Sequence, residues 1–279
     1  MIQIGRRNKL KAHIKTEAGM LLIDDAKNEV LLPEKDVPPF LKIGEMIEAF
    51  VYLDSDDWLV ATNVLPLIEL DNFALLHANQ VTSVGAFMDI GIDKDLLVPF
   101  KQQATRIEEG KSYVVFMFLD EDSNRLIGST KIQKFLNNEF LEIKEGEEVD
   151  LMVFEELPIG YLVIINNYYK GLIYHNEVFK KINIGDRLKG YVKKIKETNE
   201  VDISLQKLGF ENVLSNTEFI LDYLKKHQGF IKLTDNSSPE EIVALLNMSK
   251  KTYKKSIGIL YRQQLINIAK DGVYLISEE

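Results

Sequence analysis

The chain has 279 residues, which corresponds to about two domains if a domain has roughly 150 residues. Hydrophobic residues make up 46% and charged residues 28% of the sequence, and this ordinary globular composition excludes a disordered chain. No apolar run approaches the roughly 18 residues of a membrane helix, and the first residues lack the apolar stretch of a signal peptide. Cysteine is absent, which excludes disulfides, thiolate metal sites and thiol nucleophiles, and we expect a cytoplasmic protein.

The net charge of −9 has the wrong sign for a simple phosphate-binding protein, but the charges are unevenly distributed. Residues 1–133 contain 14 basic and 21 acidic side chains, whereas residues 134–279 contain 20 and 22. In the second half, seven bases gather in one short segment with a single acid among them. These bases are Lys180, Lys181, Arg187, Lys189, Lys193, Lys194 and Lys196. The segment is either a nucleic-acid contact or the solvated edge of a strand.

Three segments of the chain share one layout, in which two glycines are separated by 25 residues. The second glycine is the second residue of a tract rich in apolar residues, as in residues 43–54 and 109–120. The glycine pairs are Gly19 and Gly44, Gly85 and Gly110, and Gly160 and Gly185. Equal spacing with matched apolar flanks rarely arises by chance, so we interpret the pattern as an internal repeat.

Each repeat predicts a set of short strands. Residues 10–14, 86–90 and 161–165 are rich in β-branched, aromatic or other apolar residues, and polar turns follow at 120–124 and 197–200. About five strands in roughly 65–75 residues match a small Greek-key barrel of the OB type. Gly85 then fits a strand kink that closes the barrel, and the second glycine of each pair opens the long strand after a turn.

The last part of the chain changes to helical spacing. Ser238 and Glu241 form a capping box with Pro239 at the first helical position, and Ser249 can cap the next helix. The expected elements are helices at 217–226, 238–246 and 249–263 and strands at 265–268 and 273–276. This order predicts a winged form of the helix-turn-helix.

We therefore predict a mainly β, multidomain fold with three tandem OB-type, five-stranded β-barrels followed by an α+β winged-helix domain. The expected domains are residues 1–64, 65–133, 134–208 and 209–279.

Particular tracts resemble a known family. Residues 84–88 and 125–131, Val-Gly-Ala-Phe-Met and Arg-Leu-Ile-Gly-Ser-Thr-Lys, resemble the RNA-binding barrel repeat of ribosomal protein S-one. Residues 170–175, Lys-Gly-Leu-Ile-Tyr-His, are similar to the Gly-Leu-Val-His tract of that family. Three such repeats followed by a winged helix resemble the conserved virulence factor B family along the whole chain. The resemblance implies cytoplasmic RNA binding, a role in bacterial gene regulation and no catalytic activity.

The S-one-type binding surface uses two aromatic residues on the second strand, a histidine on the third, and an Asp and an Arg near the last. In the second repeat, Phe87, Asp120 and Arg125 match this pattern. Val84 and Pro99 stand in place of the first aromatic residue and the histidine.

The other repeats depart further from the pattern. In the third, Tyr174 takes the histidine position, and Lys196 and Glu200 replace the Asp and the Arg. The first keeps Asp54 and has Trp58 at the arginine position, where we expect packing in a core or a domain interface. No repeat has the full set, which favours several weak sites acting together.

The predicted RNA-binding set in the barrels combines side chains that match the family pattern with aromatic residues interleaved with bases. Its members are Phe87, Asp120, Arg125, Lys131, Tyr168, Tyr169, Lys170, Tyr174, His175, Lys193 and Lys194. Ordinary packing in a strand is the alternative for each aromatic residue.

The second helix of the helix-turn-helix is basic and contains no acid. We predict that its nucleic-acid contacts are Lys250, Lys251, Tyr253, Lys254, Lys255 and Arg262, and docking of a protein is the alternative. Tyr253 also has the spacing of an inward-facing residue, with Ile257 and Leu260. No Arg, Asn or Gln near the helix start offers readout of base edges, which disfavours sequence-specific recognition of DNA.

Signals of catalysis are poor. The four histidines lack the spacing of metal ligands, and no phosphate-binding glycine loop or nucleophile elbow is present. We therefore expect no enzyme activity, no metal and no cofactor. The predicted function is regulatory binding of single-stranded RNA by a protein that is most simply a monomer and does not bind membranes.

Two other functions remain open. The chain could be an adaptor whose barrels no longer bind RNA and whose acidic first half docks a basic protein. Alternatively, it could regulate genes by binding duplex DNA through the winged helix.

Overall fold

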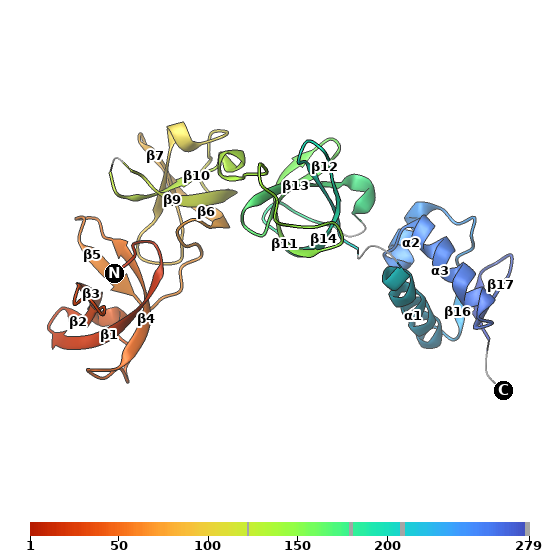
Figure 1. Ribbon diagram of the computed structural model, residues 1–279, viewed down its shortest axis with the longest axis horizontal. Coiled ribbons are helices and arrows are strands. Elements are labelled where there is room, and N and C mark those ends of the chain that lie inside the picture. The colour runs from red at the N-terminus through yellow and green to blue at the C-terminus, as the bar shows by residue number, and fades with distance from the viewer. Residues whose placement is uncertain (122, 179–180, 207–209, 277–279) are drawn as a thin grey trace. The chain divides into compact units, whose positions relative to one another are not determined.

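The computed structural model describes residues 1–121, 123–178, 181–206 and 210–276, without the side chains of 210–215. The chain divides into two units, Met1–Asn137 and Asn138–Glu279. Figure 1 shows two β modules in the first unit, and a third β module and a helical module in the second. Among the described residues, no helix is long and apolar enough to span a membrane.

The first module, barrel 1, is a closed five-stranded barrel in the order β1-β2-β3-β5-β4. Its strands are β1 (Arg7–Thr16), β2 (Gly19–Ile23), β3 (Glu29–Pro33), β4 (Met46–Leu53) and β5 (Leu59–Thr62), and the 3-10 turn η1 (Glu34–Asp36) follows β3. Apolar side chains alternate inward along these strands, so that Leu22, Leu32 and Val51 are fully buried.

The second module, barrel 2, repeats this order as β10-β9-β6-β7-β8. Its elements are β6 (Phe73–Val81), β7 (Gly85–Met88), β8 (Leu96–Pro99), η2 (Phe100–Gln102), β9 (Ser112–Leu119), β10 (Leu126–Ser129) and η3 (Ile132–Phe135). No ladder joins β8 to β10 in the described part of this module. The two strands instead pack through side chains, since a Cβ on Gly128 would come within 2.8 Å of Val98.

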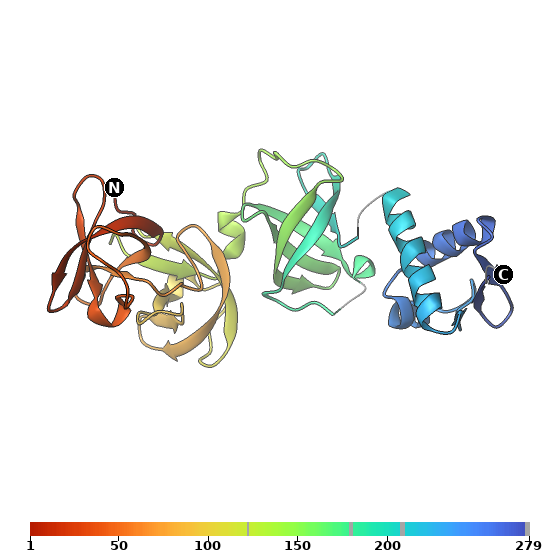
Figure 2. The same cartoon turned by 90° about the horizontal axis from the view of Figure 1, so that it is seen from below.

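The third module, barrel 3, is closed again in the order β11-β12-β13-β15-β14. Its elements are β11 (Glu148–Leu157), β12 (Gly160–Ile165), β13 (Tyr169–Tyr174), η4 (His175–Glu177), β14 (Arg187–Ile195) and β15 (Val201–Ser204). Figure 2 shows these strands wrapping around a common interior, which Val163, Ile173 and Ile203 fill.

The first glycine of each repeat explains why the three modules share one geometry. Gly19, Gly85 and Gly160 each begin the second strand of a barrel with φ between 143° and 158°. A Cβ at any of them would collide with a carbonyl oxygen of the third strand, for example that of Val98 opposite Gly85. The repeated glycine is therefore required by the close approach of two backbones, whereas the sequence predicted a strand kink at Gly85.

The last module is a winged helix with α1 (Phe210–Lys226), β16 (Phe230–Ile231), α2 (Pro239–Leu246), α3 (Lys250–Arg262), β17 (Ile266–Ile268) and β18 (Val273–Leu275). The capping box before α2 is confirmed, because Ser238 Oγ accepts from Glu241 N at 3.2 Å and the Glu241 carboxylate accepts from Ser238 N at 2.8 Å. Ser249 likewise accepts from Thr252 N at 3.1 Å and begins α3. The short strand β16, which the sequence did not predict, adds a third strand beside β18.

The predicted fold class, three barrels of the OB type and a winged helix, is confirmed. Of the predicted domain boundaries, 64/65 falls between β5 and β6 and 133/134 falls within η3. The boundary at 208/209 lies outside the described residues.

Candidate nucleic-acid interface

Two predicted RNA-binding residues of barrel 2, Phe87 and Arg125, meet at its contact with barrel 1. Both line a cavity of about 370 Å³ whose other wall is formed by Tyr52 and Leu53 of barrel 1. Phe87 is half-buried on β7, and its neighbours in the cavity include Leu97 and Ile127. Within the first unit, the predicted stacking residue thus faces a cleft between two barrels.

Arg125 is engaged by barrel 1. Its guanidinium donates to the Asp57 carboxylate at 2.5 Å, and this hydrogen bond lowers the pKa of Asp57. Beside them, Lys94 donates from Nζ to the carbonyl oxygens of Leu53 and Asp54, both at 2.6 Å. Burial is the main cause that lowers the pKa of Lys94, followed by the charge of Arg125. These bonds join the two barrels and reduce the availability of Arg125 for a phosphate.

The other predicted residues of barrel 2 lie elsewhere on the module. Asp120 holds the β9–β10 turn, because its carboxylate accepts from Ser123 N at 3.2 Å and from Ser123 Oγ at 2.6 Å. Lys131 donates from Nζ to the carbonyl oxygen of Lys101 at 2.7 Å.

Around Lys101 the structure assembles a basic and aromatic surface of which the sequence predicted only Lys131. Phe100 is 42% exposed, and the guanidinium of Arg106 lies 5.8 Å from the centre of its ring. We define the barrel 2 patch as Phe100, Lys101, Arg106 and Lys131. The signal was present, since Phe100 and Lys101 directly follow the apolar tract of the repeat.

The expectation for Trp58 is wrong. Its side chain is 72% exposed in the β4–β5 turn and belongs to no core in the described residues. The turn is held instead by Asp54, whose Oδ1 accepts from Asp56 N and Trp58 N, both at 2.9 Å. The indole is left in solvent because the turn closes through the Asp54 carboxylate and through backbone hydrogen bonds, none of which involves the Trp58 ring.

The predicted residues of barrel 3 separate into two groups. Tyr168 and Tyr169 lie at the β12–β13 turn, where Tyr168 is 53% exposed and Tyr169 is buried in the core. Lys170 and Tyr174 begin and end the outward row of β13, since residues 169, 171 and 173 point inward. His175 follows, with its Nε2 3.0 Å from the Leu157 carbonyl oxygen and its ring edge-on to Tyr161.

Carboxylates neutralise much of the basic segment of barrel 3. Lys193 pairs with Glu177 at 2.5 Å and Lys189 with Asp150 at 2.7 Å. Hydrogen bonding to Glu200 is the main cause that raises the pKa of Lys196, with Asp202 and the Tyr174 hydroxyl also close. Lys194 is exposed on β14, and Lys180 lies outside the described residues. The segment is mainly a mixed-charge surface, because three of its five described lysines already have a carboxylate partner.

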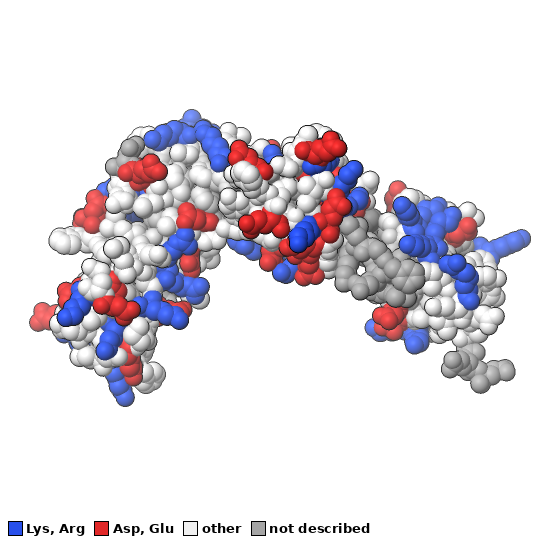
Figure 3. All heavy atoms as spheres, viewed as in Figure 1, with Lys and Arg blue, Asp and Glu red and all other residues white. Residues whose placement is uncertain are grey.

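Helix α3 provides the strongest concentration of positive charge. Lys251 and Lys255 are exposed and form no ion pair within the described part of the chain. Lys254 approaches Asp235 at 3.7 Å, and Lys250 approaches the Asn236 carbonyl oxygen at 3.5 Å. Figure 3 shows the basic side chains over this helix. Arg262 extends the same surface at the end of the helix. We call Lys250, Lys251, Lys254, Lys255 and Arg262 the α3 face.

Tyr253 is not part of that surface. Its ring is fully buried between the helices, and its hydroxyl donates to the Leu233 carbonyl oxygen at 3.0 Å. The inward spacing of Tyr253 is therefore confirmed, and its predicted contact with nucleic acid is wrong. The residue packs in the core beneath the α3 face.

No group of three His, Asp or Glu side chains that could hold a metal ion occurs among the described residues.

Comparison with known proteins assigns two of the modules. Residues 4–63 match the S1 domain model, and residues 218–275 match the CvfB-like winged helix domain model. An S1 domain together with a winged helix indicates nucleic-acid binding, which agrees with the predicted class of partner.

The chain is also similar to whole proteins. Conserved virulence factor B of Staphylococcus saprophyticus is 26% identical over 245 residues, covering 85% of this chain and 82% of that protein. The protein of the same name from Staphylococcus haemolyticus gives the same values. A crystal structure described as a multidomain protein with nucleic acid binding domains, from Streptococcus pneumoniae, is 21% identical, covers 98% of each chain and has a TM-score of 0.43. The predicted resemblance to the conserved virulence factor B family is confirmed by the curated matches and by the two family models.

Proposed function

We propose that this chain, a relative of the conserved virulence factor B proteins, binds single-stranded RNA without catalysis and so influences bacterial gene expression. The observation on which the proposal rests is the α3 face, whose composition lowers the stability of its own helix.

The first turn of a helix favours negative charge, because its free N–H groups give it a partial positive charge. Helix α2 follows this rule with Glu240 and Glu241, whereas the first turn of α3 has no acid and contains Lys250 and Lys251. Each unfavourable charge of this kind destabilises a helix by about 0.3–1 kcal/mol. A bound polyanion would offset this loss, which supports a phosphate backbone as the ligand.

Gly258 provides a second observation on the same helix. It lies in the middle of α3, where glycine is about 0.5–1 kcal/mol less favourable than alanine. Apart from the neighbouring residues and the backbone of α3 itself, no atom lies within 4 Å of the position that a Cβ would occupy, so packing does not require the glycine. The Arg262 side chain reaches this backbone, since its Nε donates to the Gly258 carbonyl oxygen at 3.1 Å. Without a Cβ at Gly258, a sugar-phosphate chain can approach the helix closely beside this guanidinium.

The choice of single-stranded RNA rests on the barrels. The barrel 2 patch presents an exposed aromatic ring beside three bases, the combination on which an unpaired base stacks while its phosphate is neutralised. Barrel 1 matches an S1 domain. Because the two surfaces belong to one chain, weak contacts at each of them add through a high local concentration.

The test is fluorescence anisotropy of the full chain with labelled oligouridine, the same DNA oligomer and a DNA duplex, at about 50 and about 200 mM salt. We expect the RNA to bind most tightly, with a log–log salt slope of about −0.7 for each phosphate neutralised. Tighter binding of the duplex would contradict the proposal in favour of a DNA regulator. No binding of any nucleic acid would favour a protein adaptor.

Substituting Gly258 by alanine should change the stability of the winged helix and its affinity for RNA in opposite directions. We expect Gly258→Ala to stabilise the winged helix by about 0.5–1 kcal/mol, since alanine favours the helix. RNA affinity should fall by about threefold, equivalent to about 0.65 kcal/mol, because the added methyl holds the backbone away from the ligand. Urea unfolding and anisotropy measure the two effects, and unchanged affinity would show that RNA does not approach this part of α3.

Releasing Arg125 from its carboxylate should strengthen RNA binding. Asp57→Asn removes the partner of Arg125, and a freed guanidinium adds up to one phosphate contact, worth about fivefold in affinity near 0.1 M salt. The matched control is Asp56→Asn, which removes the same charge from the neighbouring exposed residue. An equal rise in both variants would mean that only net charge changed and that Arg125 makes no contact.

A further inference from the structure

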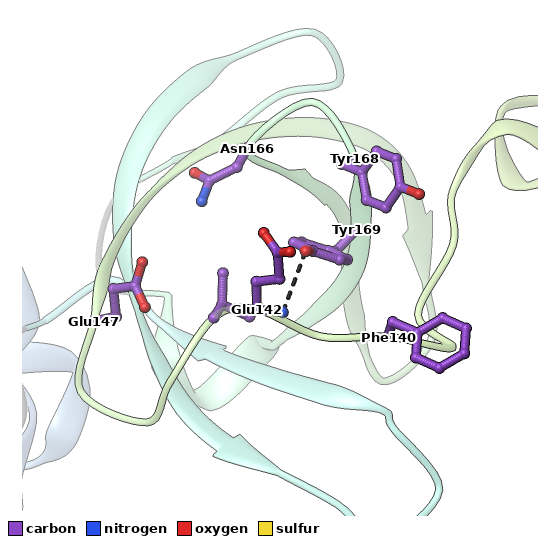
Figure 4. A pocket seen from close by; sticks show the side chains of 7 residues that line it. Phe140, Glu142, Glu147, Asn166, Tyr168 and Tyr169 are labelled. Carbon is purple, nitrogen blue, oxygen red and sulfur yellow. Dashed lines mark hydrogen bonds between the residues drawn. The ribbon is translucent and has the colours of Figure 1, made fainter.

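Barrel 3 has a second hollow surface, at the end where Tyr168 lies. The segment before β11 and the β12–β13 turn enclose a cavity of about 540 Å³, shown in Figure 4. We call this cavity the barrel 3 cup. Its lining consists of Phe140, Glu142, Ile143, Glu147, Asn166, Tyr168 and Tyr169.

Three aromatic rings line the cup, and one of them is fixed by the barrel core. Phe140 is 81% exposed and Tyr168 is 53% exposed, although both are large apolar rings. The Tyr168 ring packs edge-on against Tyr169, with 5.0 Å between ring centres. Tyr169 is held in turn by the barrel core and by Glu142 N, which donates to its hydroxyl at 3.2 Å. The cup therefore presents one anchored ring, that of Tyr169, and two exposed rings, those of Tyr168 and Phe140.

The charge of the cup is negative. Its lining contains the carboxylates of Glu142 and Glu147 and no base. In Figure 4 the Glu142 carboxylate points into the hollow beside Tyr169, and the Glu147 carboxylate faces it from the opposite side. Glu147 also accepts from Lys144 N at 2.9 Å, which fixes its position. The negative charge of the cup repels phosphate and attracts a cation, whereas the positive charge of the barrel 2 patch attracts phosphate.

We infer that the barrel 3 cup binds an arginine side chain presented by a basic segment of a partner protein. A guanidinium stacks flat on an aromatic ring and bonds a carboxylate through two parallel N–H groups, which a lysine ammonium does not do. The rings and carboxylates of the cup supply both kinds of contact in one place. This interaction is independent of RNA binding and uses surfaces that the proposed function does not need.

Arginine is favoured over a nucleobase by the two carboxylates. A base stacked on Tyr168 would bring its phosphate toward Glu142 and Glu147, and this repulsion opposes binding. In this inference Tyr168 and Tyr169 contact a cation, whereas the sequence predicted that they contact RNA.

The experiment is an NMR titration of the full chain, labelled in its tyrosine and phenylalanine rings, with capped Gly-Arg-Gly, Gly-Lys-Gly and Gly-Gln-Gly peptides. We expect the Phe140 and Tyr168 ring signals to shift with the arginine peptide, more weakly with lysine, and not with glutamine. Glu142→Gln and Glu147→Gln should each weaken binding of the arginine peptide about fivefold. Glu197→Gln, an exposed acid in the β14–β15 turn, is the matched control and should leave binding unchanged.

Two outcomes would overturn the inference. One is an equal response to the arginine and glutamine peptides, which would remove the role of charge. The other is a shift of the Phe140 and Tyr168 ring signals with oligouridine and not with the arginine peptide, which would show that Tyr168 contacts RNA. The proposed function is tested separately, because Glu142→Gln should leave oligouridine binding to the full chain intact.

Discussion

Replacing both Lys251 and Lys255 by glutamate should lower the affinity for oligouridine by at least about tenfold near 0.1 M salt. Each phosphate contact contributes a factor of about five at this concentration, given a salt exponent of about −0.7 per phosphate. The two side chains are exposed, share one side of α3 and have no carboxylate partner in the part of the chain that the structure describes. The salt slope should become shallower by about 1.4.

The same double variant should not destabilise the protein. Residue 251 lies in the first turn of α3, where a negative side chain is favoured by about 0.3–1 kcal/mol. We expect urea unfolding to show equal or higher stability of the winged helix. A loss of binding together with preserved stability would be evidence for a contact surface, because an unfolded domain would lose both.

The control for this variant is charge reversal at Lys225 and Lys226. These residues lie in the last turn of α1, where positive charge is favoured. Lys225→Glu with Lys226→Glu changes the net charge equally, should lower stability by about 0.3–1 kcal/mol per residue, and should leave most of the RNA affinity. Equal losses of affinity in the two double variants would contradict a specific role for the α3 face.

Substituting Gly85 by alanine should destabilise barrel 2 by on the order of 3 kcal/mol. The φ of Gly85 is 153°, and an added Cβ would collide with the Val98 carbonyl oxygen and approach the Cα of Pro99 at 2.9 Å. The atoms involved are backbone, so they cannot move aside without breaking the β7–β8 ladder. Hydrogen exchange should accelerate in β6, β7 and β8 and remain unchanged in barrel 3.

Gly110 is the matched control for Gly85. It also has a positive φ, of 78°, but no atom lies within 4 Å of the position of its Cβ. Gly110→Ala should therefore destabilise barrel 2 by only about 1 kcal/mol, which is the cost of a positive φ for a residue that has a Cβ. If the two variants were equally unstable, the close approach of β7 and β8 would not be the reason for the repeated glycine.

Several parts of the molecule could be predicted because their signals are local. The barrels follow from a glycine spacing and from strand alternation, and the winged helix follows from Ser238, Glu241 and Ser249, which bond within three residues of themselves. Burial of Tyr253 also follows from its spacing. In each case, the residues that decide the structure are neighbours in the sequence.

The candidate site could be predicted only in part. Phe87 and Arg125 do meet, but their environment depends on barrel 1, and Asp57 is 68 residues from Arg125 in the chain. The ion pair between Lys193 and Glu177, which weakens the basic character of barrel 3, also joins separate elements. Exposure of Trp58 and grouping of Arg106 with Phe100 are further results of folding.

The sequence by itself determined the four modules, their order, their strand-closing glycines and the basic character of α3. These features depend on backbone conformation and on side-chain periodicity, both of which are properties of short segments. Only the tertiary structure decided which charges remain available to a ligand and which aromatic rings face solvent. Those properties depend on pairing across strands and between barrels, because a charge loses its attraction for a ligand only when folding brings an opposite charge beside it.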